Sequence, residues 1–289
     1  MILAALAALA AGPFVAISLA QRVPPSEIPT NTQPTTTTAP PTQTTTTTPS
    51  DNPPTTKTPR IIAPLPTANL APKNIAVPQT VSLSNETTLS RWAYSEKRTK
   101  IYSRPSLYAK GVGRLRLYTE DGFPEVYLLL EEHVDKKRRI WVKVRVPKRP
   151  NGRTGWVKRS SLAAYRQNAH QLIVNRKTFK ATLYRRGKQI WQASVGVGKP
   201  GTITPSGRFY VREKFRFKNR PVYGSRAIGT SAYAPTLSDW PGGGVVGLHG
   251  TDEPGLLPGR VSHGCVRIRN SQIIKLYNLI PVGTPIWIQ

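Results

Sequence analysis

The Thr/Pro-rich stretch of residues 23–80 constrains the fold most, because such a long part of the chain is not expected to join a hydrophobic core. It contains unbroken threonine runs at residues 35–38 and 44–48, and prolines recur along its length. Such a segment has little apolar surface to bury, so burial does not offset the conformational entropy lost on folding. We expect a disordered linker over residues 23–90, extended where proline favours polyproline II.

An uncharged apolar segment, residues 2–20, precedes this linker. Its length is just enough to span a bilayer, and Ser18-Leu19-Ala20 has the small-x-small pattern of a signal-peptide cleavage site. Residues 1–22 are therefore expected to be either a cleaved signal peptide or an uncleaved membrane anchor. Both alternatives export the remainder of the chain, to the cell wall or the periplasmic space.

Positive charge is concentrated in the second part of the chain. The sequence has 42 Lys and Arg against 14 Asp and Glu, a net charge of +28, and residues 1–90 contribute only four basic and three acidic residues. A field of this sign attracts polyanions. For an exported chain these are anionic wall polymers or a membrane surface, and the alternative is an excess that only maintains solubility. No nucleic-acid-binding motif occurs, so no nucleic-acid partner is expected.

Residues 91–165 alternate short apolar runs with turns, which indicates a small β domain. Strands are predicted at residues 126–130 and 140–146, and residues 150–157 are predicted as an Asn151-Gly152 turn followed by a strand. Trp141 and Trp156 are expected in its core, with an aromatic ligand groove as the alternative.

Residues 168–289 form a second predicted domain, also mainly β. Strands are predicted at residues 172–174, 181–184, 189–193, 209–211, 245–248 and 285–288, with a hairpin turn at Arg186-Gly187. One short helix is expected after Arg269, capped by Asn270, with Ile273, Ile274 and Tyr277 on one face.

Cys265 is the only cysteine, so it cannot form an internal disulfide. A single Cys with His residues nearby is the composition of a thiol nucleophile and its base, since only the thiolate attacks acyl carbon well. His263 and His249 are the candidate bases. Two residues apart on an extended chain, His263 and Cys265 would share a face. This set is not a structural-zinc pattern, so neither a metal nor another cofactor is expected.

The segment Ser262-His263-Gly264-Cys265-Val266-Arg267, with His249 upstream, resembles the signature of the L,D-transpeptidase catalytic domain, the YkuD family. Residues 197–209, 227–233 and 240–244 are similar to further family segments, in the same order. The turn and strand at residues 151–157 resemble an SH3-like domain that often precedes this catalytic domain. The resemblance implies a small SH3-like barrel followed by a β-sandwich-like catalytic domain with one short helix near the active site.

The resemblance also assigns roles to residues. It implies that Cys265 is the nucleophile and His249 the general base, oriented by the carbonyl of Gly250, with His263 in support or as the competing base. The amides of Gly264 and Cys265 are expected to form an oxyanion hole. The expected substrate-binding residues are Arg267, which is either a carboxylate clamp or one half of a structural ion pair, Ser262, which also bonds within its loop, and Tyr233 and Trp240 of the cleft walls.

The function that the resemblance implies is an exported peptidoglycan L,D-transpeptidase. Cys265 would cleave after the third residue of a stem tetrapeptide and transfer the acyl group to an amine of a second stem, which forms a 3→3 cross-link. Water as acceptor would make the enzyme an L,D-carboxypeptidase. A non-catalytic wall-binding protein is the alternative from another class.

Overall fold

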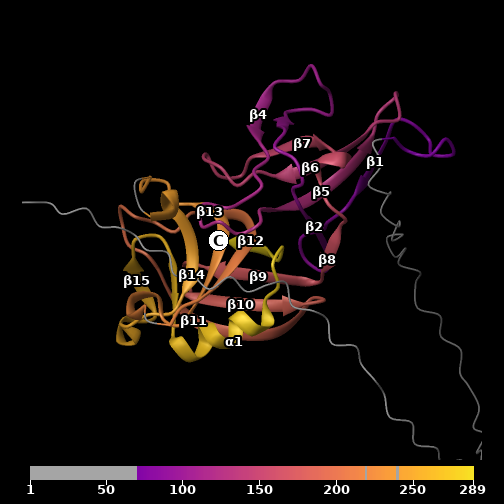
Figure 1. The fold of residues 1–289 in the computed structure, drawn as a ribbon. Coiled ribbons are helices and arrows are strands. Elements are labelled where there is room, and N and C mark those ends of the chain that lie inside the picture. The colour runs from indigo at the N-terminus through magenta and orange to yellow at the C-terminus, as the bar shows by residue number, and fades with distance from the viewer. Residues whose placement is uncertain (1–69, 219, 239–240) are drawn as a thin grey trace, which may run out of the picture. The chain divides into compact units, whose positions relative to one another are not determined.

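The computed structural model describes residues 70–218, 220–238 and 241–289. The predicted signal peptide or anchor and most of the predicted linker lie outside the described residues. Two β-sheets and one α-helix make up the described part (Figure 1). The described part is thus mainly β with one short α-helix, as predicted. None of the helices in the described residues is both long and apolar enough to cross a membrane.

The first sheet has eight strands, all in antiparallel pairs, in the order β4-β3-β7-β6-β5-β2-β8 with β1 added on β5. The strands are β1 (Gln79–Ser82), β2 (Ser90–Tyr94), β3 (Lys100–Tyr102), β4 (Gly111–Arg114), β5 (Val126–Val134), β6 (Ile140–Arg145), β7 (Thr154–Lys158) and β8 (Arg166–Asn168). A short 3-10 helix, Arg159–Ser161, follows β7.

The first sheet begins inside the segment predicted as linker. β1 pairs with β5, and Leu83 just after it is buried in the core of this sheet. Residues 79–90 therefore belong to the folded part, and the predicted end of the linker at residue 90 is too late. Composition does not reveal this, because Val81 and Leu83 are single apolar residues among polar ones. Leu83 is buried and Val81 half-buried, and the strand that pairs with β1 lies some fifty residues away in the sequence.

The predicted strands of this region are confirmed by β5, β6 and β7. Trp141 is fully buried and Trp156 nearly so, which confirms their place in the core. Gly152 has a φ of +85°, the left-handed conformation expected for the glycine of an Asn-Gly turn. The relationship of this sheet to an SH3-like domain stays a prediction.

The second sheet has nine strands in the order β10-β9-β17-β12-β13-β14-β16-β11-β15, and β11 also pairs with β10. The strands are β9 (His170–Asn175), β10 (Lys180–Arg185), β11 (Lys188–Gly198), β12 (Gly207–Arg216), β13 (Arg226–Tyr233), β14 (Val245–His249), β15 (Gly259–Ser262), β16 (Val266–Ile268) and β17 (Pro285–Ile288). Short 3-10 helices lie at Pro221–Tyr223, Pro241–Gly244 and Pro254–Leu256.

Six of these strands confirm the predicted ones, and the Arg186-Gly187 turn between β10 and β11 has the positive φ of both central residues that such a hairpin needs. Three pairs are parallel: β9 with β17, β14 with β16, and β11 with β15. Parallel neighbours come from distant parts of the chain, so this sheet joins segments that are far apart in sequence.

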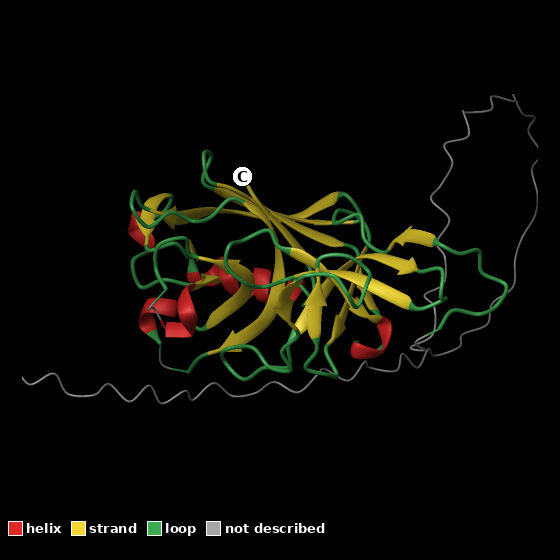
Figure 2. Ribbon diagram, turned by 90° about the horizontal axis from the view of Figure 1, so that it is seen from above, coloured by secondary structure: helices red, strands yellow, loops and turns green. Residues whose placement is uncertain are grey.

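The α-helix of the described part, α1 (Asn270–Leu279), packs against β13 and β14. Strands make up most of the described part, and its helices are few and short (Figure 2). Its buried residues are Ile273, Leu276 and Tyr277, whereas Ile274 is 37% exposed, so the predicted face is correct except at Ile274. Asn270 does not cap the helix. Its side-chain oxygen accepts a hydrogen bond from the backbone N–H of Thr251 at 3.0 Å, which ties the start of α1 to the segment after β14.

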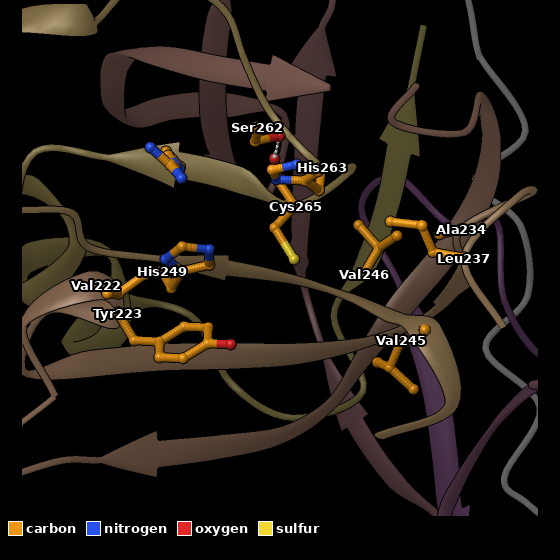
Figure 3. A pocket seen from close by; sticks show the side chains of 12 residues that line it. Val222, Tyr223, Ala234, Leu237, Val245, Val246, His249, Ser262, His263 and Cys265 are labelled. Carbon is orange, nitrogen blue, oxygen red and sulfur yellow. Dashed lines mark hydrogen bonds between the residues drawn. The ribbon is translucent and has the colours of Figure 1, made fainter. Parts of the chain in front are cut away.

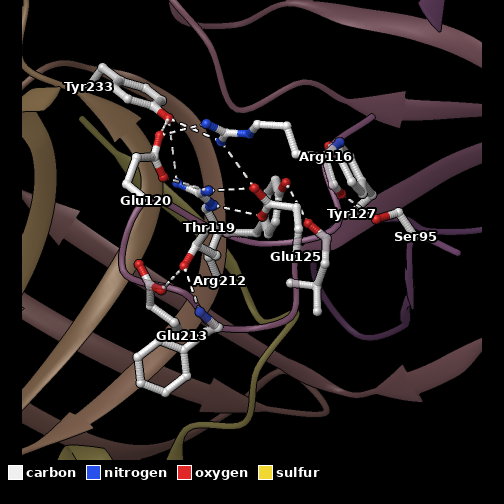
Figure 4. Close-up of polar contacts among 12 residues, drawn as sticks. Ser95, Arg116, Thr119, Glu120, Glu125, Tyr127, Arg212, Glu213 and Tyr233 are labelled. Carbon is white, nitrogen blue, oxygen red and sulfur yellow. Dashed lines mark hydrogen bonds and ion pairs between the residues drawn. The ribbon is translucent and has the colours of Figure 1, made fainter. Parts of the chain in front are cut away.

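The two sheets share buried contacts. Trp92, Val126 and Leu128 of the first sheet pack with Tyr210 of β12, and the Tyr210 hydroxyl donates to the carbonyl of Val126 at 3.0 Å. Beside them, the Arg212 guanidinium donates to both carboxylate oxygens of Glu125 (Figure 4). The second sheet is therefore held against the first by apolar packing and by buried charge.

Candidate active site

Parallel pairing of β14 with β16 brings residues 249 and 265 together. Leu248 lies opposite Val266, and His249 lies opposite Arg267. Cys265 directly precedes β16, and the N–H of Gly247 donates to its sulfur at 3.5 Å. Gly247 and His249 are two residues apart in one strand, so the strand presents them on the same face.

Cys265 and His249 line one cavity of about 60 Å³. Figure 3 shows the Cys265 sulfur directed into the space between His249 and Val246. His263, Ser262 and Arg267 also line the cavity, with an apolar side formed by Val222, Tyr223, Ala234, Leu237, Val245 and Val246. A thiol, an imidazole and an apolar wall are thus gathered at the edge where β14 and β16 meet.

The Cys265 thiol is half-buried, and burial raises its pKa. The Gly247 N–H and the positive charge of Arg267 act in the opposite direction without reversing this effect. The resting cysteine is therefore a neutral thiol at pH 7, and it needs a base at the moment of attack.

His249 is 5% exposed, and burial lowers its pKa to about 4. Its Nδ1 lies 2.6 Å from the carbonyl oxygen of Gly250, the contact that the sequence analysis expects. A carbonyl only accepts, so Nδ1 carries the proton and Nε2 keeps its lone pair for the thiol proton. Gly250 has no room for a side chain, since an added Cβ would lie 2.1 Å from Oδ1 of Asn270.

The Tyr223 ring packs edge-on against the His249 imidazole, with 4.9 Å between the ring centroids (Figure 3). Tyr223 is the last residue of the 3-10 helix Pro221–Tyr223, which precedes β13. Sequence reasoning missed this residue. Tyr223 lies outside the motif segments, and its contact with His249 arises only from the pairing of β13 with β14.

The loop at residues 262–265 is held by its own hydrogen bonds. The Ser262 hydroxyl donates to the carbonyl of Cys265 at 2.5 Å and accepts from the N–H of Gly264 at 3.2 Å. The bonding expected within this loop is therefore present. The Gly264 N–H thus has a partner inside the loop. The oxyanion-hole role expected of the Gly264 and Cys265 amides stays a prediction.

Gly264 bends the chain between His263 and Cys265. Its φ of +122° is open to glycine and strained for residues with a side chain. The expectation that His263 and Cys265 share a face assumed an extended chain, and the segment is not extended. His263 is exposed and Cys265 half-buried, although both line the cavity.

Thr204 holds the cysteine loop from outside and was not singled out by the sequence. Its hydroxyl donates to the carbonyl of Gly264 and accepts from the N–H of Gly198, each at 2.8 Å, and the residue is 1% exposed. It therefore fixes the loop to the end of β11. A Thr sixty positions before the loop gives no local signal of this contact.

Of the expected substrate-binding residues, Arg267 lines the cavity, and its Nη1 pairs with Glu253 at 2.5 Å. The ion-pair alternative is therefore present in the structure. Tyr233 does not line the cavity. Its hydroxyl bonds to Glu120, Arg116 and Arg212 between the two sheets (Figure 4), because the end of β13 turns toward the first sheet. Trp240 lies outside the described residues.

The part of the chain that the structure describes contains no group of three or more His, Cys, Asp or Glu side chains placed to hold a metal ion. Glu253, which is close to the histidines in sequence, pairs with Arg267. The side chains at the site include one thiol and two imidazoles, which suits acyl transfer through sulfur.

These features define a cysteine acyltransferase. The family model of the L,D-transpeptidase catalytic domain, YkuD, matches residues 169–288. The chain belongs to this family, whose members are cysteine-dependent acyltransferases.

Two relatives come from Bacillus subtilis (strain 168) and carry the L,D-transpeptidase names YqjB and YkuD. The chain is 33% identical to YqjB over 125 residues, which cover 40% of this chain and 69% of YqjB. It is 31% identical to YkuD over 115 residues, which cover 40% of this chain and 62% of YkuD. The NMR structure of the Enterococcus faecium L,D-transpeptidase catalytic domain is 25% identical, covers 42% of this chain and 98% of that one, and has a TM-score of 0.32.

Proposed function

We propose that this chain is an exported peptidoglycan L,D-transpeptidase that forms 3→3 cross-links through a thioester on Cys265. The observation that carries the proposal is the His249 tautomer. Its Nδ1 is committed to the Gly250 carbonyl, so Nε2 is available as a base in the cavity that holds the Cys265 sulfur. The family acts on peptidoglycan peptides, which supplies the substrate class.

Acylation begins with transfer of the thiol proton to Nε2 of His249 while the sulfur attacks the carbonyl carbon of the third stem residue. A carbon–sulfur bond forms and the carbonyl becomes an oxyanion. The oxyanion then collapses, and the bond to the terminal D-Ala breaks. Its amine takes the proton from His249 and leaves. Thioester and free D-Ala are the products, with no net change in protons.

Deacylation reverses these roles. The side-chain amine of a second stem gives a proton to His249 and attacks the thioester, and the departing sulfur recovers that proton. The new amide is the 3→3 cross-link. Water attacking the same thioester would release a tripeptide and make the enzyme an L,D-carboxypeptidase, so the acceptor alone separates the two activities.

Export to the wall rests on the sequence. Residues 2–20 are apolar and uncharged, and the Thr/Pro-rich segment after them has the composition of a tether. The net charge of +28 gives such an enzyme an attraction to anionic wall polymers or to the membrane surface. The tether sets how far the active site reaches from its attachment.

The test is incubation of the full chain with a stem tetrapeptide, followed by mass analysis of the products. We expect a cross-linked product and released D-Ala, and a covalent adduct of one carbapenem per chain. Cys265→Ala should abolish both. Adduct formation by Cys265→Ala would overturn the nucleophile, and intact substrate with the natural chain would favour the non-catalytic wall-binding alternative. Release of tripeptide without cross-links would assign the carboxypeptidase.

The two histidines are separated by their variants. His249→Ala should slow acylation by a factor of about 10² to 10⁴, the usual effect of losing a general base. His170→Ala, at a half-buried histidine outside the cavity, is the matched control and should acylate normally. His263→Lys should keep more activity than His263→Ala. If His249→Ala loses little acylation activity and His263→Lys loses all of it, His263 is the general base and His249 has the supporting role.

A further inference from the structure

A second and larger cavity, of about 800 Å³, lies where the first sheet meets the end of β13. We call it the basic groove. Its charged lining residues are Lys100, Arg114, Arg116, Lys148 and Arg149, with Glu120 as the one carboxylate among the described residues that line it. It is separate from the cavity of Cys265, and neither the family match nor the relatives assign it a ligand.

The acidic groups at the groove already form ion pairs with arginines of the protein itself. Glu120 pairs with Arg116 and with the buried Arg212, and it also accepts from the Tyr233 hydroxyl (Figure 4). Glu125, fully buried below it, pairs with the same two arginines. These carboxylates therefore leave little negative charge for the other cations of the groove.

Three cations of the groove have no carboxylate partner within the described part of the chain. They are Lys100, Arg114 and Lys148, and all three side chains are exposed. The Lys100 ammonium lies over the Tyr102 ring, 5.2 Å from its centroid, which fixes its position without neutralising it. The groove is therefore lined by cations that no carboxylate of the described residues neutralises. The groove walls have a lower dielectric constant than water, which strengthens the electric field of these cations.

Arg149 connects the groove to the catalytic cavity. Its guanidinium donates to the carbonyls of Ala234, Leu237 and Gly243 and lies over the Tyr233 ring, 5.0 Å from its centroid. Carbonyl oxygens leave its full charge in place. Ala234 and Leu237 line the catalytic cavity, so one segment forms a wall of both spaces.

We propose that the basic groove binds an anionic polymer with repeated phosphodiester groups, and so holds the active site along that polymer. The inference deepens the proposed function and rests on its export to the wall. A single carboxylate is best bound by one guanidinium fork, whereas the open cations here come from β3, β4 and the segment after β6. Separated cations with two ammonium groups suit phosphates spaced along a chain.

The test measures binding of the full chain to a fluorescently labelled synthetic poly(glycerol phosphate) by anisotropy at low salt. The groove variant is Lys100→Gln/Arg114→Gln/Lys148→Gln. The control variant is Lys177→Gln/Lys188→Gln/Lys275→Gln, at three exposed lysines outside the groove with the same loss of charge. We expect affinity to fall by roughly tenfold or more in the groove variant and by less than about threefold in the control.

Two further variants keep the test decisive. Lys148→Glu, at an exposed position, should weaken binding even where the triple variant folds poorly, and Cys265→Ala should bind as the natural chain does. Failure of tetrapeptide turnover would thus contradict the proposed function alone. Failure of polymer binding would contradict the groove alone.

The ligand class is tested by three further probes. Glycerol phosphate should bind far more weakly than its polymer, because repeated contacts raise the effective concentration of each phosphate. Polyglutamate should bind more weakly than poly(glycerol phosphate). Equal losses in the groove and control variants, or equal affinity for polyglutamate, would overturn the proposal. A third outcome would also overturn it: the groove variant loses binding to phosphatidylglycerol vesicles while its binding to the polymer is unchanged. The groove would then bind a lipid headgroup.

Discussion

Cys265 and His249 rest as a neutral pair, because burial disfavours charge on both. It raises the pKa of the thiol and lowers that of the imidazole to about 4. Arg267 favours the thiolate and disfavours the imidazolium, and its pairing with Glu253 reduces both effects. Charge therefore develops only when an acyl carbon is present to receive the sulfur, which protects the thiol from other reactions at rest.

This resting state predicts the pH dependence of acylation. The base form of His249 is needed, and its pKa of about 4 lies below the ordinary histidine value of about 6.5. Acylation by a carbapenem should therefore stay constant as pH falls through 6.5 and decline only near pH 4. The measurement is the rate of adduct formation across this range, with His170→Ala as a control of identical profile. A decline centred near pH 6.5 would show that His249 is not the titrating base.

The residues that sequence reasoning located are those whose chemistry is rare or local. Cys265 is unique in the chain, and Gly250 follows His249 directly. Thr204 and Tyr223 were missed because common residue types act there through distant pairing of strands. Tyr233 was placed on a cleft wall because its segment matched, but its hydroxyl bonds to groups of the first sheet. Side-chain direction at the end of a strand depends on the neighbouring sheet, which the segment itself does not encode.

At the scale of elements, strands with continuous apolar runs were predictable and short or polar ones were not. β5 and β6 carry such runs, whereas β16 has three residues and β1 is mostly exposed. Parallel pairing of β14 with β16 builds the active site, yet no property of the two sequences indicates that they are neighbours. The helix was predictable from its apolar spacing, although Ile274 is exposed because α1 buries only a narrow stripe.

Thr204 links two elements, and its replacement tests that link. Thr204→Val keeps the shape of the side chain and removes both hydrogen bonds of its hydroxyl, which leaves the Gly198 N–H and the Gly264 carbonyl without this partner. We expect a loss of about 1 to 3 kcal/mol in unfolding free energy, and slower acylation because the Cys265 loop is less fixed.

Thr204→Ser should restore the acylation rate, since the hydroxyl returns, and exposed Thr178→Val is the matched control. Denaturant unfolding and carbapenem adduct rates provide the two measurements. Normal acylation in a destabilised Thr204→Val would limit the residue to a purely structural role.

At the scale of the whole described part, the two sheets meet through buried charge as well as apolar packing. Arg212 of β12 is fully buried and pairs with Glu125, the residue directly before β5. Removing one member of such a pair leaves an uncompensated buried charge, so each sheet depends on the other for the stability of this contact. The loop before β5 contributes Thr119, whose hydroxyl donates to Glu213 at 2.5 Å across the same junction.

Glu213 makes this junction sensitive to pH. Burial raises the pKa of its carboxyl group to about 7, against the opposing effects of the Thr119 hydrogen bond and the Arg212 charge. In the unfolded chain the carboxyl titrates at about 4.3. Between these values the folded state holds a proton that the unfolded state has lost. The unfolding free energy therefore decreases as pH rises from about 4.5 through 7.

Glu213→Gln should remove this dependence, because the amide carries no titrating proton and keeps an oxygen that accepts from Thr119. At pH 8 we expect the variant to exceed the natural chain by about 3 to 4 kcal/mol in unfolding free energy, while at pH 4.5 the two should be similar. Denaturant unfolding of the full chain at both values is the measurement, with exposed Glu96→Gln as the control. An unchanged difference between the two pH values in Glu213→Gln would place the titrating group elsewhere. The contact of Thr119 with Glu213 would then be an ordinary hydrogen bond between the sheets.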